Sequence, residues 1–181
     1  MEIQGHALPL ASALFFHQKI FYMSVSSIQH SADKRLAELG IVLPPCPRPV
    51  ANYVPFIISE KLLFVSGQGP RTADQKLMTG KVGRDISLED AYAHARLVGI
   101  NLLSVANHAQ NGLTNIRRLV KLTGFVNASE DFRDHPKVIN GCSDLMVEVF
   151  GDAGKHARSA VGVASLPENI SVEIEAIFEI A

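Results

Sequence analysis

Arg158 is the residue of this chain best suited to binding a small anion, and it stands where an apolar run begins near the C-terminus. Its guanidinium group is a planar fork that can hold a carboxylate through two parallel hydrogen bonds. An arginine at the start of a strand is also commonly a solvated end residue. The residue type and its position therefore leave a carboxylate anchor and a solvated strand end as open alternatives.

Two further positions could take part in chemistry. Glu173 alternates with the apolar residues Val172 and Ile174, so it lies either on the wet face of a strand or in a site. Gly67 follows an apolar run, and a glycine there allows the backbone to come close to another group. Gly67 belongs either to a plain turn or to a backbone segment that faces a ligand. Neither Ser66 nor Ser159 is paired with a base and an orienting acid, so we predict no serine nucleophile.

Composition indicates one globular domain and excludes several function classes. The chain has 181 residues with 17 basic and 18 acidic side chains, a net charge of −1, which gives no support for a nucleic-acid groove. The seven histidines show no metal-site spacing, and Cys46 and Cys142 lack the spacing of a zinc site. We therefore predict no metal, no cofactor, and two free thiols in a reducing compartment, which points to the cytoplasm.

Residues 1–30 differ from the rest and are predicted to be an extension ahead of a single domain at 31–181. An apolar run at 7–16 is too short to span a bilayer. Glu2 precedes it and no Lys or Arg does, which is the wrong charge for a secretory signal. A disordered arm, a targeting segment and a translation start at Met23 remain open.

The remaining chain has the periodicities of alternating strands and helices. Ser87 with Asp90 three residues later is typical of a helix start, and Pro136 suits the first turn of a second helix. Leu62–Val65 is almost continuously apolar, which predicts a strand buried on both faces. The expected elements are a short helix at 34–39 between Ser31 and Gly40, a stiff proline-rich connector at 43–49, strands at 52–58 and 62–66, a helix at 87–110, a strand at 115–126, a helix at 136–150, and two strands around a turn at 166–169.

This order predicts an α+β fold in which a mixed sheet carries two helices on one face. No remaining segment looks able to cover the other face, so we expect a partner subunit there.

Several short motifs, taken in order, resemble the RidA/YjgF family. They are Asn52-Tyr53-Val54, Phe64–Gln68, Val120–Val126 with Asp131-Phe132, Val138–Asn140, Arg158-Ser159-x-Val161, Leu166-Pro167 and Val172–Ala176. The similarity spans about 49–181. The segments 34–41 and 154–157 are less similar to the best-known members, and Ala160 stands where those members commonly have cysteine.

The resemblance implies a YjgF/chorismate-mutase-like fold and a homotrimer with a pocket at each subunit interface. It implies hydrolysis of reactive enamines and imines such as 2-aminoacrylate to 2-keto acids and ammonia, with no cofactor. The resemblance also implies that Arg158 binds the substrate carboxylate and that Glu173 positions or activates water. It further implies that Tyr53, Gly67 and Asn140 bind the substrate.

Two other functions remain open at this level. One is a non-catalytic module that binds a small carboxylate metabolite at the same interface. The other is a ribonuclease or translation inhibitor, against which the near-neutral charge argues. We expect a small-molecule carboxylate partner, and neither nucleic acid nor a membrane.

Overall fold

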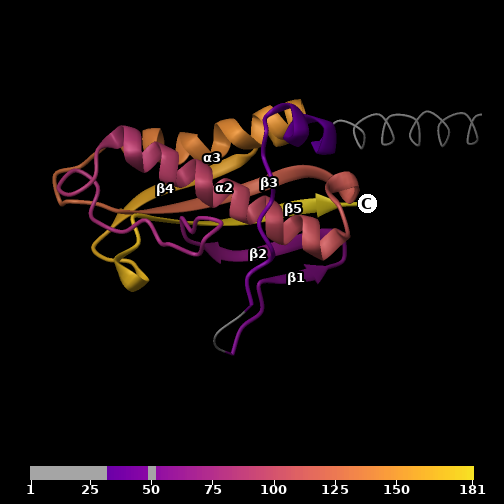
Figure 1. Cartoon of the computed structure of the whole chain (residues 1–181), viewed down its shortest axis with the longest axis horizontal. Coiled ribbons are helices and arrows are strands. Elements are labelled where there is room, and N and C mark those ends of the chain that lie inside the picture. Colours follow the sequence, from indigo (N-terminus) through magenta and orange to yellow (C-terminus); the bar gives the residue numbers. More distant parts are fainter. Residues whose placement is uncertain (1–31, 49–51) are drawn as a thin grey trace, which may run out of the picture.

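The computed structural model describes residues 32–48 and 52–181, and it contains a five-stranded mixed sheet with two long helices on one side (Figure 1). The elements are β1 (Phe56–Ser59), β2 (Leu62–Gln68), α2 (Leu88–Gln110), β3 (Ile116–Asn127), α3 (His135–Phe150), β4 (Ala157–Val163) and β5 (Val172–Ile180), with 3-10 turns at Leu113–Asn115, Gly151–Gly154 and Pro167–Asn169. The strand order is β1-β2-β5-β3-β4. Only the β3–β4 pair is parallel among these. The predicted fold class is confirmed.

The helices begin and end where their capping residues predict. The Ser87 side chain caps α2 by accepting a hydrogen bond from the Asp90 N–H, and Asn111 closes the helix in a left-handed conformation. A short helix covers residues 32–38 and stops before Gly40, whose φ is +66°. The predicted extension at 1–30 and the predicted cap Ser31 lie outside the described residues. No helix among those described is long and apolar enough to cross a membrane.

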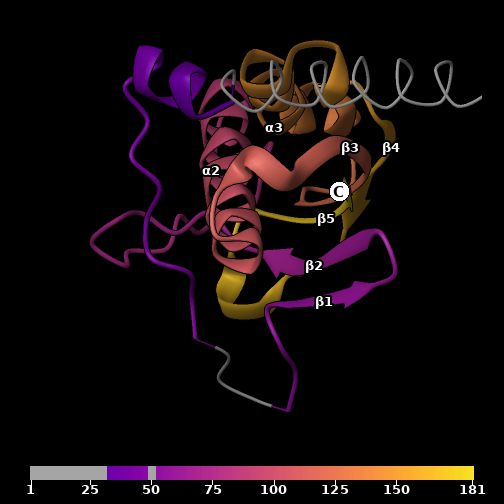
Figure 2. The ribbon, with the colours of Figure 1, turned by 90° about the vertical axis from the view of Figure 1, so that its right-hand side faces the viewer.

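The two long helices pack closely because small residues line their contact. A Cβ atom added to Gly141 would lie 2.0 Å from the backbone oxygen of Tyr92. On the outside of the pair, the Arg96 guanidinium lies 2.7 Å from the Glu148 carboxylate. The Tyr92 hydroxyl donates to Asp144 at 2.8 Å. Figure 2 shows α2 and α3 side by side over the sheet.

The core lies between the helices and the sheet, and within residues 32–48 and 52–181 the opposite face of the sheet is left open. On β2 the side chains of Leu63 and Val65 are buried, whereas Leu62 and Phe64 are 36% and 40% exposed. The prediction that this strand is buried on both faces is therefore wrong. Its alternate side chains point to a face that no helix among the described residues covers.

The first strand is shorter than its apolar pattern indicates. It begins at Phe56 rather than at Asn52. Pro55 has no N–H to donate to a ladder, so it delays the pairing. Its carbonyl still accepts from the Ser66 N–H at 3.0 Å, which joins the two segments just before β1 starts.

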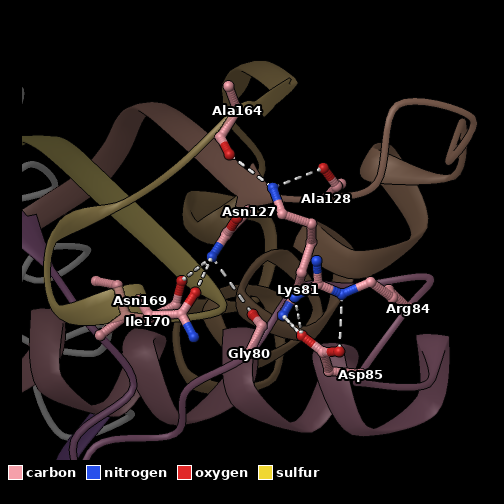
Figure 3. Close-up of polar contacts among 9 residues, drawn as sticks. All are labelled: Gly80, Lys81, Arg84, Asp85, Asn127, Ala128, Ala164, Asn169 and Ile170. Atoms are coloured by element: carbon pink, nitrogen blue, oxygen red, sulfur yellow. Dashed lines mark hydrogen bonds and ion pairs between the residues drawn. The ribbon is translucent and has the colours of Figure 1, made fainter.

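Two polar side chains fix the turn between β4 and β5 (Figure 3). The Asn127 amide donates to the backbone oxygen of Ile170 and to the side chain of Asn169, both at 3.1 Å. The Lys81 ammonium donates to the backbone oxygen of Ala164 at 2.6 Å. The turn is thereby attached to the end of β3 and to the loop before α2.

Replacing Gly141 by alanine is expected to lower the free energy of unfolding by about 3 kcal/mol, because the added methyl meets backbone that cannot move without separating α2 from α3. Lys137→Ala, on the exposed side of the same helix, should change it by less than about 0.5 kcal/mol. Urea denaturation at one protein concentration measures both. Equal free energies of unfolding for Gly141→Ala and Lys137→Ala would contradict the close packing of α2 and α3.

Candidate functional site

Arg158 lies on the edge strand β4 and is held by α3. Its Nη1 donates to the Asn140 side-chain oxygen at 2.8 Å and to the Ser143 hydroxyl at 2.9 Å. The guanidinium is thus part-buried and fixed, which is unlike a solvated strand end. The structure brings together two of the residues predicted for the site, Arg158 and Asn140.

Behind Arg158 stands a serine–histidine pair that the sequence did not reveal. The Ser143 hydroxyl lies 3.1 Å from His156 Nε2, and His156 Nδ1 lies 2.6 Å from the Gly154 carbonyl oxygen. A carbonyl only accepts, so Nδ1 carries the proton and Nε2 accepts from Ser143. Burial, together with the charge of Arg158, lowers the pKa of His156 even though the Gly154 bond opposes this, so the ring is neutral at pH 7.

A spacing signal for this pair was present in the sequence. Ser143 follows Asn140 by three residues, which places both on one helix face. His156 precedes Arg158 by two residues, which is the spacing of one strand face. Neither spacing is informative until α3 is known to pack over β4.

Glu173 lies elsewhere, beside Gly67. A Cβ atom on Gly67 would be 2.2 Å from the Glu173 carboxylate oxygen, so any larger residue here would displace this carboxyl group. Both residues, with Tyr53, line a cavity of about 580 Å³. Burial, and to a lesser degree the neighbouring charge of Glu175, raises the pKa of Glu173. The group therefore holds a proton at a pH where an ordinary glutamate has lost it.

The two groups of predicted residues lie on opposite faces of the sheet. Arg158 on β4 is in register with Leu122 on β3, which is in register with Ala176 on β5. Leu122 and Ala176 are buried beneath the helices, so Arg158 lies on the same face of the sheet. Ile174 is also buried on that side, so its neighbour Glu173 projects from the open face. One copy of the chain therefore cannot bring Arg158 to Glu173.

The open face has the character of a contact surface. Ile57 is 58% exposed and Val161 is 45% exposed. A hollow of about 740 Å³ lies on this side of the sheet. Its lining is Asn52, Tyr53, Val54, Phe56, Ile57, Phe64, Val65, Ser66, Lys121, Thr123, Glu175, Ala176 and Ile177. Large apolar side chains gathered in this way are typical of surfaces that bind another protein.

Neither cysteine is placed for thiol chemistry. Both Cys46 and Cys142 are free. Complete burial raises the pKa of Cys142 to about 12, which keeps it a thiol at neutral pH. Ala160 lies in register with Gly124 and packs against the core. In the described ranges, no group of three His, Cys, Asp or Glu side chains is arranged to hold a metal ion.

Comparisons with known proteins agree on one family. The family model described as "YjgF/chorismate mutase-like, putative endoribonuclease" matches residues 33–179. Protein TCP17 of Trypanosoma cruzi is 41% identical over 146 residues, which is 80% of this chain and 91% of that protein. A 2-iminobutanoate/2-iminopropanoate deaminase of Dermatophagoides farinae is 30% identical over 138 residues, 76% of this chain and 92% of that protein. The crystal structure of an Agrobacterium tumefaciens protein of unknown function has a TM-score of 0.78 and 46% identity, covering 88% of this chain and 99% of that one.

Stability should depend on pH through His156. Because its pKa is lowered on folding, the unfolded chain binds the proton first, and folding loses stability as pH falls through about 6.5. The free energy of unfolding of wild type should therefore exceed that of His156→Gln by less at pH 5 than at pH 7.5. Urea denaturation at a fixed protein concentration measures it. A difference that does not change with pH would show that His156 is not a neutral acceptor.

Proposed function

Because this chain belongs to the YjgF/RidA family, we propose that it is a deaminase that hydrolyses reactive enamines and imines of the 2-aminoacrylate type to 2-keto acids and ammonia. The observation that carries the proposal is Glu173, a half-buried carboxyl with a raised pKa in a cavity beside Gly67 and Tyr53. The 30% identical relative named as a 2-iminobutanoate/2-iminopropanoate deaminase supports it. Two free thiols fit a reducing compartment, and we assign the reaction to the cytoplasm.

Arg158 is the carboxylate anchor in this proposal. Asn140 and Ser143 hold one nitrogen of its fork. The remaining N–H groups can bind a substrate carboxylate with paired hydrogen bonds. Fixing the carboxylate also fixes the adjacent carbon, which is the carbon that water attacks. Positioning of this kind supplies much of the rate acceleration in a reaction with a simple chemical step.

Glu173 moves the protons. In its acid form it protonates the terminal carbon of the enamine, which gives the imine. The resulting carboxylate then takes a proton from water as the water oxygen bonds to the C=N carbon. Returning that proton to nitrogen breaks the C–N bond and ammonia leaves. The carboxylate then takes the remaining proton of the hydroxyl group as the water oxygen becomes the keto oxygen, which restores the acid form of Glu173. A pKa raised toward neutrality allows one group to act as acid and base in turn.

The site is completed by a second copy of the chain. Arg158 and Glu173 occupy opposite faces of one sheet, so the carboxylate anchor and the acid–base group have to come from different subunits. The exposed apolar side chains on the open face supply a surface for that contact. We propose a cyclic homotrimer with one site at each of its interfaces.

Arg158→Ala is expected to lower kcat/KM for 2-aminoacrylate by about 100-fold or more, because a charge-assisted bidentate bond is lost. The enamine is generated in the cuvette by a pyridoxal-phosphate enzyme, and keto-acid release is followed. Circular dichroism and sedimentation show whether the variant is folded and assembled.

Mixing Arg158→Ala with Glu173→Gln subunits tests the interface directly. After unfolding and refolding together, roughly a quarter of the sites combine an intact Arg158 with an intact Glu173 from different chains. Activity should then return to roughly a quarter of wild type. A mixture as inactive as its parents would place both groups in one chain and overturn the shared site.

The pH dependence of kcat should report Glu173. The acid form of Glu173 protonates the enamine, so with 2-aminoacrylate kcat should fall as pH rises through the pKa of this carboxyl, which lies above the usual glutamate value. Glu173→Gln should lower kcat by about 10²–10⁴-fold and remove this limb. Glu175→Gln removes the like charge that helps raise the pKa of Glu173, so it should move the limb to lower pH. A limb that persists in Glu173→Gln contradicts the assignment.

A folded, assembled protein that accelerates no imine would instead be a binding module. Small carboxylates would then raise its melting temperature without turnover, and Arg158→Ala would abolish that stabilisation.

A further inference from the structure

The cavity that contains Glu173 has a second, basic wall. Arg48 and Arg71 line it together with Tyr53, Gly67 and Glu173, and both also line an adjoining cavity of about 210 Å³. Across the described ranges 32–48 and 52–181, neither arginine forms an ion pair with a carboxylate. Their charges are therefore not neutralised by Glu168 or Glu173 in the same cavity.

Helix α2 positions the loop that carries Arg71. Asn101, a buried amide on this helix, donates to the backbone oxygens of Gly69 and Arg71, both at 3.0 Å. Arg71 Nη1 donates to the Gln75 carbonyl at 3.0 Å. One of five N–H groups is thereby committed, and the fork keeps donors for an anion.

The same helix positions the connector that carries Arg48. Ser104, three residues after Asn101, donates to the Pro44 carbonyl at 2.5 Å. The prolines of this segment restrict its backbone. Figure 2 shows the connector running alongside α2 toward the sheet. The segment ahead of the sheet therefore contributes a side chain to the cavity.

We propose, on the basis of the deaminase function above, that this wall binds a second carboxylate, and that the substrates are imines of dicarboxylic 2-oxo acids. Arg158 of one subunit would bind the carboxylate next to the imine carbon, while Arg71 and Arg48 of the other bind the distal one. The cavity of about 580 Å³ leaves room beside Glu173 for a second carboxylate to reach these arginines. Hydrolysis is unchanged: water supplies the keto oxygen, nitrogen leaves as ammonia, and nothing is oxidised or reduced.

The test compares two stable products of equal chain length, 2-oxoglutarate and 2-oxopentanoate, which differ only in a terminal carboxylate. Isothermal titration of the assembled wild-type protein should show at least about tenfold tighter binding of 2-oxoglutarate, because paired arginines bind a carboxylate strongly. Equal affinities would overturn the proposal.

Variants of Arg71 and Arg48 test whether these arginines cause the preference for 2-oxoglutarate. Arg71→Gln and Arg48→Gln should each reduce the ratio of the two affinities, and the double variant should bring it close to one. Arg84→Gln is the matched control, since Arg84 is exposed, pairs with Asp85 and lies outside the cavity lining. A ratio that survives in the folded double variant rules out these arginines. If Arg71→Gln does not fold, the affinity ratio of Arg48→Gln still tests whether the arginines cause the preference for 2-oxoglutarate.

Binding is measured without turnover, so it is independent of the deaminase assay. If no imine is hydrolysed but the diacid preference depends on Arg71 and Arg48, the diacid site is established and the deaminase function fails. If 2-aminoacrylate is hydrolysed and both keto acids bind equally, the deaminase function remains and the second carboxylate site is overturned.

Discussion

The alternation of side chains along a strand is the constraint on which the rest of this structure depends. Arg158 can lie beneath α3 only on the face where Leu122 and Ala176 are buried. Glu173, next to the buried Ile174, must then project from the other face. The same constraint leaves Phe64 exposed on β2. An uncovered apolar face and a divided set of polar residues therefore have one cause, and one second copy of the chain would resolve both.

The setting of Arg158 suits it to binding an anion rather than to stabilising the fold. Its hydrogen-bond partners Asn140 and Ser143 are neutral acceptors that orient the guanidinium without cancelling its charge. An arginine whose charge is not paired in a part-buried position gains from a carboxylate ligand, because water already solvates it incompletely. His156, which contacts Ser143, is also a neutral neighbour of Arg158. Its lowered pKa leaves the ring neutral, so it fixes Ser143 without adding a second cation.

The sequence predicted what depends on local physics and missed what depends on packing between distant segments. The Ser87 cap and Pro136 correctly placed the starts of α2 and α3. The expectation that β2 is buried on both faces was wrong, because hydropathy alone does not distinguish a side chain in the core from an exposed apolar side chain on the surface. The Ser143–His156 pair joins α3 to the segment before β4 across the 3-10 turn Gly151–Gly154, and the spacings within each segment become informative only once the packing of α3 over β4 is known. The roles of Tyr53, Gly67 and Asn140 came from family resemblance alone.

In the proposed site, the neighbouring subunit and the substrate would shift the pKa of Glu173 in opposite directions, and this sets the order of substrate binding and protonation. Within one chain, burial and Glu175 raise the pKa of this carboxyl. A neighbouring subunit's positive guanidinium would lower it again, because an opposite charge favours the ionised form. A substrate carboxylate bound to that guanidinium cancels the effect. In the proposed trimer Glu173 would therefore regain its proton as the substrate arrives, so the acid that protonates the enamine would form in the occupied site.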